Sequence, residues 1–335
     1  MKKLVLLAVV LLASATFAYA QFTYCSIDDP AGYGTRVRGI NNTGQIVGSY
    51  VYDQYGDVHA LLIQNGQFIP LGPNTILQTE YSDAYKINDR GDVVGIVCDE
   101  VACHGFLLHK GVVTTLDYPG ASDTYATSIN ESGNIIGYWD LYDNQGNFLY
   151  EQGFTYKNGN FTELTYPGSG DTSAVGNNDF DVVVGIWDTG PTATTGSGFV
   201  EWLGQFISFQ APFPDVAYTQ GDGINDFGLI VGQEYTATEY ANELGHGFLS
   251  IGPHFTQLNY PGAMETTAWG INLAGQMVGN WYDSNYDAHG WLIRPFNKTC
   301  PKFQVLEPSQ FSSTPNAQAS GRKISVPTRL QRMSK

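Results

Sequence analysis

The sequence is poor in basic residues. It holds 16 Lys+Arg against 32 Asp+Glu. All of the acidic residues lie before residue 308, whereas two of the basic residues stand at the start of the chain and five follow residue 307. A body this acidic repels the phosphates of DNA and RNA, which excludes nucleic acids as partners. The same charge suits cations or neutral sugars.

Long apolar runs are also missing. After residue 20, no run reaches the roughly 18 apolar residues that a membrane-spanning helix needs. The run Leu4–Leu12 is shorter, follows Lys2 and Lys3, and precedes Ala18-Tyr19-Ala20, which has the form of a cleavage site. We therefore expect residues 1–20 to be a signal peptide and the protein to be secreted, to the periplasm or the cell exterior. No cysteine follows the site, so we expect no lipid anchor there. No sorting sequence is visible at the C-terminus, which leaves the question of anchoring open.

Cysteines are few, and none has the CxxC spacing of zinc or redox sites. The four that are present could form disulfides in an exported chain, in three possible pairings. Cys98 and Cys103 flank four residues between two strand-like runs, so a hairpin could place them opposite each other. Cys25 and Cys300 lie at the two ends of the body. We favour these two pairs.

The body also lacks any long run with helical periodicity, whereas one strand–turn–strand stretch occurs six times. The copies span residues 39–48, 86–95, 128–137, 176–185, 223–232 and 270–279. Each has an Asn seven residues before its closing Gly, and successive Asn residues are 47, 42, 48, 47 and 47 positions apart. A period of this size filled with short strands is typical of a propeller or a related repeat array.

Each repeat predicts four strands. In the third, these are residues 124–129, 134–139, 153–156 and 160–166, and the first two are joined by a turn at 130–133 where Asn and Gly tolerate positive φ. Pro167-Gly168 then ends the fourth strand, because proline donates no ladder hydrogen bond. Apolar and polar residues alternate along these segments, as expected of strands.

The two ends of the body predict how the array closes. Residues 23–30 resemble a fourth strand without strands one to three before it, whereas the last repeat shows strands one to three and only a doubtful fourth at 303–306. A ring in which the N-terminal strand completes the last blade removes the exposed edges of an open array. We predict an all-β, six-bladed β-propeller of four-stranded antiparallel blades over residues 21–307, followed by a disordered basic tail at 308–335.

The recurring motifs resemble those of the HAF-repeat family of bacterial extracellular proteins. They are Gly-Ile-Asn-x-x-Gly-x-Ile-Val-Gly, a His-Gly-Phe triplet and Leu-x-Tyr-Pro-Gly, and the resemblance covers residues 22–307. The matching triplets begin at His104, His246 and, with Trp for Phe, His289; the chain departs from the pattern at residues 59–61, 152–154 and 197–199. The resemblance implies an exported, propeller-like protein, and it assigns no activity.

Four repeats carry a histidine at the start of strand three: His59, His104, His246 and His289. A ring of imidazoles could bind a metal, but equivalent positions converge only near the axis, and strand three is not the innermost strand. We therefore expect each histidine to bond a neighbouring backbone group, and we predict no metal site and no cofactor.

Acidic and aromatic residues gather in the loops that follow strands two and four, which share one face of a propeller. As tentative ligand-binding residues from the loops after strand two we name Tyr52, Asp53, Tyr55, Asp140, Tyr142, Asp143, Tyr235, Tyr240, Tyr282, Asp283 and Tyr286. The turns after strand four add Asp83, Asp123, Tyr125, Asp171, Asp215 and Tyr218. Aromatic planes with hydrogen-bonding rims suit sugar rings or a peptide.

Catalytic motifs are absent from the sequence. It has no Gly-x-Ser-x-Gly elbow, no His-Glu-x-x-His and no Ser-x-Asp-x-Gly-x-x-Trp box of sialidase blades. Residues 143–147 resemble a calcium loop but lack its later Glu, so we interpret them as a hairpin turn. We predict a monomeric, non-enzymatic binding or scaffold module that contacts carbohydrate or protein. The alternatives are a carbohydrate-active hydrolase or lyase that uses loop carboxylates, and a purely structural surface protein.

Overall fold

The computed structural model describes residues 22–29, 34–51, 58–72, 75–78, 80–242, 245–294 and 299–305. The predicted signal peptide and the predicted tail lie outside these residues. Within them, no helix combines the length and the apolar character needed to cross a bilayer.

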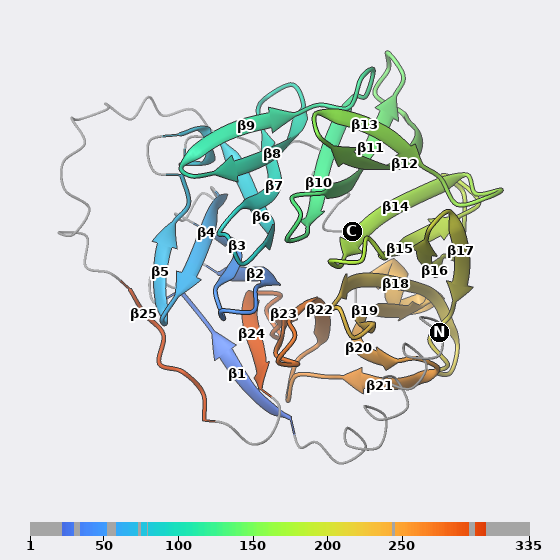
Figure 1. Cartoon of the computed structure of the whole chain (residues 1–335). Helices are drawn as coiled ribbons and strands as arrows, with labels where there is room; N and C mark the ends of the chain where they lie inside the picture. The colour runs from blue at the N-terminus through green and yellow to red at the C-terminus, as the bar shows by residue number, and fades with distance from the viewer. Residues whose placement is uncertain are drawn as a thin grey trace, which may run out of the picture.

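Six antiparallel sheets surround a common axis (Figure 1). In four of them, four consecutive strands follow one another from the axis outward. The second blade comprises β6 (Tyr81–Ile87), β7 (Val93–Cys98), β8 (Cys103–His109) and β9 (Val112–Leu116). The third comprises β10 (Asp123–Ile129), β11 (Ile135–Tyr142), β12 (Phe148–Lys157) and β13 (Asn160–Leu164). The fourth comprises β14 (Asp171–Asn177), β15 (Val183–Asp188), β16 (Ser197–Trp202) and β17 (Gln205–Phe209). The fifth comprises β18 (Val216–Ile224), β19 (Leu229–Thr236), β20 (His246–Ile251) and β21 (His254–Leu258).

The last blade is completed by the start of the chain. Its own strands are β22 (Glu265–Ile271), β23 (Met277–Tyr282) and β24 (Ala288–Arg294), and β1 (Thr23–Ile27) pairs antiparallel with β24. The innermost strands contact their neighbours around the whole ring, in the order β2, β6, β10, β14, β18, β22 and back to β2. The predicted six-bladed propeller and its closure by the N-terminal strand are therefore confirmed.

The first blade has five strands instead of four. Its four antiparallel strands are β2 (Thr35–Ile40), β3 (Ile46–Val51), β4 (Val58–Gln64) and β5 (Gln67–Pro70). The fifth, β25 (Gln304–Val305), pairs in parallel with β5. The interpretation of residues 303–306 as a fourth strand of the last blade was therefore wrong, because β1 already occupies the outer edge of β24. Two short helices, η1 (Ile76–Gln78) and α2 (Ala237–Asn242), lie in the connections.

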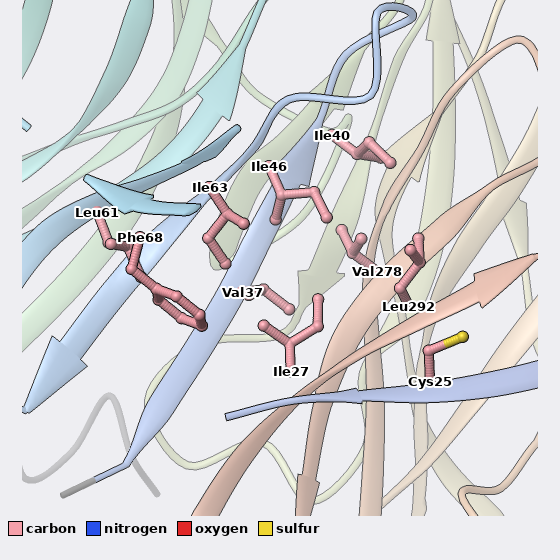
Figure 2. Close-up of a cluster of buried hydrophobic side chains, with 10 residues drawn as sticks. All are labelled: Cys25, Ile27, Val37, Ile40, Ile46, Leu61, Ile63, Phe68, Val278 and Leu292. Carbon is pink, nitrogen blue, oxygen red and sulfur yellow. The ribbon is translucent and has the colours of Figure 1, made fainter. Parts of the chain in front are cut away.

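Apolar side chains fill the space between neighbouring blades. At the junction of the first and last blades, Cys25 and Ile27 of β1 pack with Val278 and Leu292 and with buried residues of the first blade such as Val37 (Figure 2). The disulfide Cys25–Cys300 joins the same region, with its Cα atoms 5.5 Å apart. Hydrophobic contact and a covalent bond thus hold the ring closed.

The repeated Asn links each blade to the next. The Asn130 Oδ1 accepts hydrogen bonds from the backbone N–H groups of Ser132 and Asn134, both at 3.0 Å, which shapes the turn. Its Nδ2 donates to the carbonyl of Asn178, the equivalent residue of the next blade, at 3.1 Å. Each of the six Asn side chains donates in this way to the carbonyl of the Asn in the next blade: residue 41 to 88, 88 to 130, 130 to 178, 178 to 225, 225 to 272 and 272 to 41. These six bonds form a closed ring around the axis.

In five of the six repeats, the closing Gly makes room for an aromatic ring. The first strand of every blade has a register irregularity opposite strand two, and in the third blade it falls between Ala126 and Ser128. The carbonyl of Tyr125 then lies where a Cβ of Gly137 would stand, and that Cβ would also lie 2.8 Å from the ring of Phe154. Phe106, Phe199, Phe248 and Trp291 cover the equivalent glycines. The His-Gly-Phe triplet therefore supplies the ring, and the closing Gly leaves space for it.

Candidate functional site

A cavity of about 590 Å³ lies on the axis. It is lined by the innermost strands of all six blades and by residues near the ends of the second strands. Phe148 and Tyr286, which follow the second strands of the third and last blades, belong to its lining, so it reaches the face that carries the variable loops. A protein cavity of this size holds a small molecule.

The cavity is chemically asymmetric although the framework around it repeats. Three residues before the repeated Asn, the six blades present Arg38, Tyr85, Thr127, Val175, Asp222 and Trp269, all of which line the cavity. Five residues before the Asn, Arg36, Ser173, Gln220 and Thr267 line it as well. We did not predict this site from the sequence. Its signal is that these positions differ in every blade, whereas the positions that build the framework recur.

The first blade contributes positive charge to the cavity wall. Arg38 forms an ion pair with the fully buried Asp83 of the second blade, with its Nε 3.0 Å from Oδ2. Its guanidinium also lies 4.2 Å from the centre of the Trp269 ring and 5.0 Å from that of Tyr85. Cation–π contacts and the ion pair hold Arg38 in place and neutralise it. Arg36, on the same strand, lines the cavity beside it.

Lys86 occupies the end of the cavity that points away from the variable loops. Four other blades have Gly at this position, because a Cβ there would come close to the backbone of the next inner strand, as at Gly176, 2.7 Å from the carbonyl of Asp222. Lys86 lines both the cavity and a small depression among the six Asn turns on the opposite face. Burial lowers the pKa of Lys86 to about 8.

The third and fourth blades contribute acidic groups, on the side of the ring opposite the first blade. Asp140 stands opposite Asp123 and Glu151 on its neighbouring strands, and Asp171 stands opposite Asp188. Burial, with the adjacent Asp123 carboxylate, raises the pKa of Asp140 to about 7. Burial also raises the pKa of Asp188 to about 6 and that of Glu151 well above its ordinary value. Asp140 and Glu151 repel each other when both are ionised, so protonation of either one is favoured.

This cluster predicts that the protein is more stable in mild acid. Each raised pKa means that the folded state holds a proton at a pH at which the unfolded chain has lost it. The free energy of unfolding therefore falls as pH rises from about 4 to the folded-state pKa values, by up to about 1.4 kcal/mol per pH unit for each such carboxyl. We expect the Tm to fall between pH 5 and pH 7, measured by calorimetry at constant ionic strength.

Two variants test the cause of that slope. Asp140→Asn removes one of the two interacting carboxyls and is expected to flatten the dependence of Tm on pH. Glu163→Gln, on the exposed outer strand β13, is the matched control and should leave the slope unchanged. A Tm that rises between pH 5 and pH 7 in the wild-type protein would contradict the assignment.

The predicted ligand-binding residues are divided between the cavity and the turns. Tyr235, Tyr282 and Tyr286 line the cavity. Asp140 is buried, and its Oδ2 accepts a hydrogen bond from the Tyr142 hydroxyl at 3.3 Å. Tyr52, Asp53 and Tyr55 and the side chain of Tyr240 lie outside the described part of the chain.

Asp143 and Asp283 shape their own turns. The Asp143 Oδ1 accepts from the backbone N–H groups of Gln145 and Asn147, both at 2.8 Å. Asp283 accepts from Asn285 at 2.8 Å and from Asp287 at 3.0 Å in the same way. The segment 143–147 is therefore a hairpin turn, as predicted. Both aspartates are half-buried, and neither lines the cavity.

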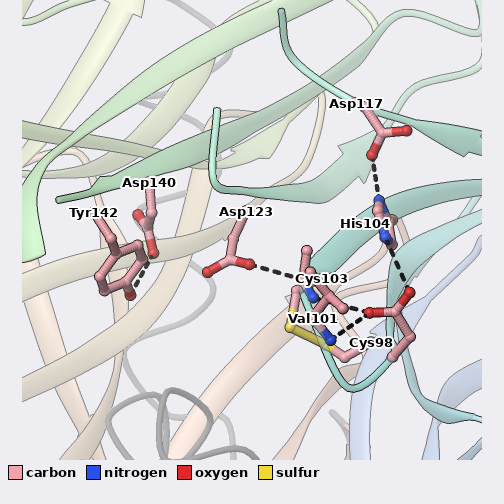
Figure 3. Close-up of a disulfide and its surroundings, with 10 residues drawn as sticks. Cys98, Val101, Cys103, His104, Asp117, Asp123, Asp140 and Tyr142 are labelled. Atoms are coloured by element: carbon pink, nitrogen blue, oxygen red, sulfur yellow. Dashed lines mark hydrogen bonds and ion pairs between the residues drawn. A yellow bond between two sulfur atoms is a disulfide. The ribbon is translucent and has the colours of Figure 1, made fainter. Parts of the chain in front are cut away.

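The strand-three histidines bond the outer strand of their own blade. The Nδ1 of His104 lies 2.6 Å from the Asp117 carboxylate, that of His246 lies 2.8 Å from Asn259, and that of His289 lies 2.6 Å from Asp28 (Figure 3 shows His104). Only His59 contacts a backbone group, the carbonyl of Glu80, at 3.2 Å. The expected backbone partner was thus wrong for three of the four, because an Asp or Asn side chain stands nearby. No group of three or more His, Cys, Asp or Glu among the described residues is arranged to hold a metal ion.

Both predicted disulfides are present. Cys98–Cys103 closes the hairpin between β7 and β8, and the backbone N–H of Cys103 donates to Asp123 at 2.8 Å (Figure 3). The hydrogen bond from Cys103 to Asp123 connects the second blade to the first strand of the third blade, next to the acidic cluster.

Comparisons with known proteins show the fold and no more. No protein-family model and no curated protein matches the sequence. A protein of unknown function from Dyadobacter fermentans is similar in structure, with a TM-score of 0.50, 9% identity, and coverage of 84% of this chain and 100% of that one. A fucose-specific lectin from Aleuria aurantia has a TM-score of 0.47 and 12% identity, over 82% of this chain and 95% of the lectin. The β-propeller domain of a protease from Pyrococcus furiosus has a TM-score of 0.44 and 8% identity, over 80% and 96%. The resemblance to HAF repeats is therefore confirmed for the propeller fold, and membership stays a resemblance.

Proposed function

We propose that the protein is a non-enzymatic binding propeller outside the cytoplasm that holds a carbohydrate in its axial cavity. The observation that carries this proposal is the asymmetric lining. A propeller that served only as a structural spacer would need no distinct chemistry at equivalent positions of its six blades. A cavity with aromatic rings, carboxylates and amides on different sides can fix the orientation of one ligand.

A sugar suits this lining better than a peptide or an apolar molecule. The wall combines phenols such as Tyr138 and Tyr282 with hydrogen-bonding groups such as Gln220, Gln233 and Asn280. Rings of this kind pack against the faces of sugar rings while the polar groups meet the hydroxyls. The cavity is also too confined for a folded partner, and this favours the carbohydrate over the protein in our sequence-based prediction.

Two disulfides support the location. Such bonds persist in oxidising compartments, and the predicted signal peptide would deliver the chain to one. Neither pair lines the axial cavity: one closes the ring and the other closes a hairpin, so both serve the frame of the propeller.

The proposal is tested with purified protein on a glycan array and by tryptophan fluorescence, since Trp187 and Trp269 line the cavity. We expect binding to a restricted set of glycans. Tyr282→Ala should weaken it by about tenfold or more, because stacking and hydrogen-bonding contacts are both lost. Trp202→Ala, in an exposed position on the outer part of the fourth blade, is the matched control and should bind normally. Binding to no glycan would contradict the proposal.

A carbohydrate-active hydrolase or lyase is the second candidate, and one observation favours it. Glu151 lines the cavity, and burial raises the pKa of its carboxyl well above the ordinary value, which suits a general acid. Incubation of the bound glycans with the protein distinguishes the two. Products that accumulate with time, and that disappear in Glu151→Gln, would show an enzyme.

A further inference from the structure

Among the described residues of the cavity wall, Arg36 is a cationic group on the side of the first blade, and its surroundings differ from those of Arg38. Arg36 lines the wall, and its guanidinium forms no ion pair or hydrogen bond with any residue that the structure describes. Its neighbour Arg38 is paired with Asp83 and stacked between two aromatic rings. The two arginines therefore have different roles: Arg38 belongs to the frame, and Arg36 is available to a ligand.

Burial removes part of the hydration of the Arg36 guanidinium, and its nearest compensating charge, Asp83, is already paired with Arg38, so Arg36 keeps donors free for an anion. Its planar, five-donor fork matches the two oxygens of a carboxylate. Tyr81 and Tyr282 line the same cavity and interact electrostatically with Arg36, so their hydroxyls lie where they can assist the same group.

The opposite wall does not repel an anion as strongly as its composition suggests. Burial raises the pKa of Glu151 in the third blade, and that of Asp222 in the fifth, well above their ordinary values, so both carboxyls hold a proton more readily than exposed ones do. Neutral carboxyls donate and accept hydrogen bonds, as sugar hydroxyls do. Ser173, which donates to Glu151, stands beside them on the innermost strand of the fourth blade.

We propose that the ligand of the cavity is a carboxylate-bearing sugar, held with its carboxylate on Arg36 of the first blade and its hydroxyls toward Glu151, Ser173 and Asp188 of the third and fourth blades. This inference rests on the proposed carbohydrate-binding function and narrows its ligand class. It also explains how a protein with this many acidic residues can bind an anionic ligand, because Arg36 neutralises the charge of the carboxylate.

The test uses matched pairs of glycans on one array. Each pair consists of a galacturonate, glucuronate, mannuronate or sialic acid oligosaccharide and its methyl ester, which keeps every hydroxyl and removes the charge. We expect the acids to bind and the methyl esters to show no binding. Equal binding of both members, or binding of neutral glycans only, would overturn the inference and leave the proposed function standing. Binding to no glycan at all would overturn both.

Arg36 is then tested with the acid that binds best. Arg36→Gln is expected to weaken binding by about 30-fold or more, because the carboxylate loses its buried charged partner. Arg36→Lys keeps the charge without the fork and should retain part of the affinity. Both variants should keep the wild-type Tm and circular dichroism. If Arg36→Gln folds and binds as tightly as the wild-type protein, Arg36 is not the anchor and the inference is wrong.

Discussion

Replacing Gly137 by alanine is expected to prevent the third blade from forming. The added methyl group would meet the carbonyl of Tyr125 at the irregular point of β10 and would lie 2.8 Å from the ring of Phe154 on β12. Neither group can withdraw: the carbonyl is part of the inner strand, and the Phe154 ring is fully buried between blades. Substitutions that force an added atom against the backbone of a close-packed core are among those that lower protein stability most.

We expect Gly137→Ala to lower the free energy of unfolding by about 4 kcal/mol or more, or to abolish the yield of folded protein. Urea unfolding followed by circular dichroism measures the effect. Thr162→Ala is the matched control, because Thr162 is exposed on β13 of the same blade, and it should change the stability by less than about 0.5 kcal/mol. A Gly137→Ala protein with the wild-type midpoint would show that the blade can relax around the glycine.

Removing the Cys25–Cys300 disulfide is expected to have the second large effect. The bond spans 275 residues of sequence, and on the chain-entropy account a loop of this length contributes about 5 to 6 kcal/mol by restricting the unfolded chain. The double variant Cys25→Ser, Cys300→Ser should therefore lower the Tm strongly. The measurement is calorimetry under oxidising conditions.

The second disulfide provides the control. Cys98–Cys103 spans only five residues, for which the same account gives about 2 kcal/mol. Cys98→Ser, Cys103→Ser should consequently destabilise the protein far less than the first pair of substitutions. Equal losses from the two double variants would contradict an entropic origin and would indicate that local packing dominates at both sites.

The architecture could be predicted because the repeat encodes it locally. The Asn of each turn fixes the turn with its Oδ1 and stands seven residues before the closing Gly in every repeat, and in five blades that Gly packs against the aromatic residue of strand three. The N-terminal strand was also recognisable, since Asp28 occupies the place that Asp117 holds opposite His104 in the second blade. Residues 303–306 were misplaced because a two-strand contact such as β25–β5 leaves no pattern in the sequence.

The cavity could not be predicted by the same reasoning. We searched the variable loops for acidic and aromatic residues, and three of the tyrosines found there line the cavity. Most of the lining, however, comes from the innermost strands, where Arg36, Arg38 and Asp222 occupy positions that alternate with framework residues. Which of two alternating faces points to the axis depends on the irregularity in the first strand of each blade, and that irregularity is visible only once the strands are paired.

The pairing of β1 with β24 also determines when the protein can be finished. Residues 23–27 are made first, and their partner strand, residues 288–294, comes near the end of the propeller. During synthesis the leading strand stays unpaired until almost the whole propeller has been made, and its edge is exposed to capture by other chains. The last blade can therefore form only in a chain that extends through β24, because a shorter chain has no pairing partner for β1.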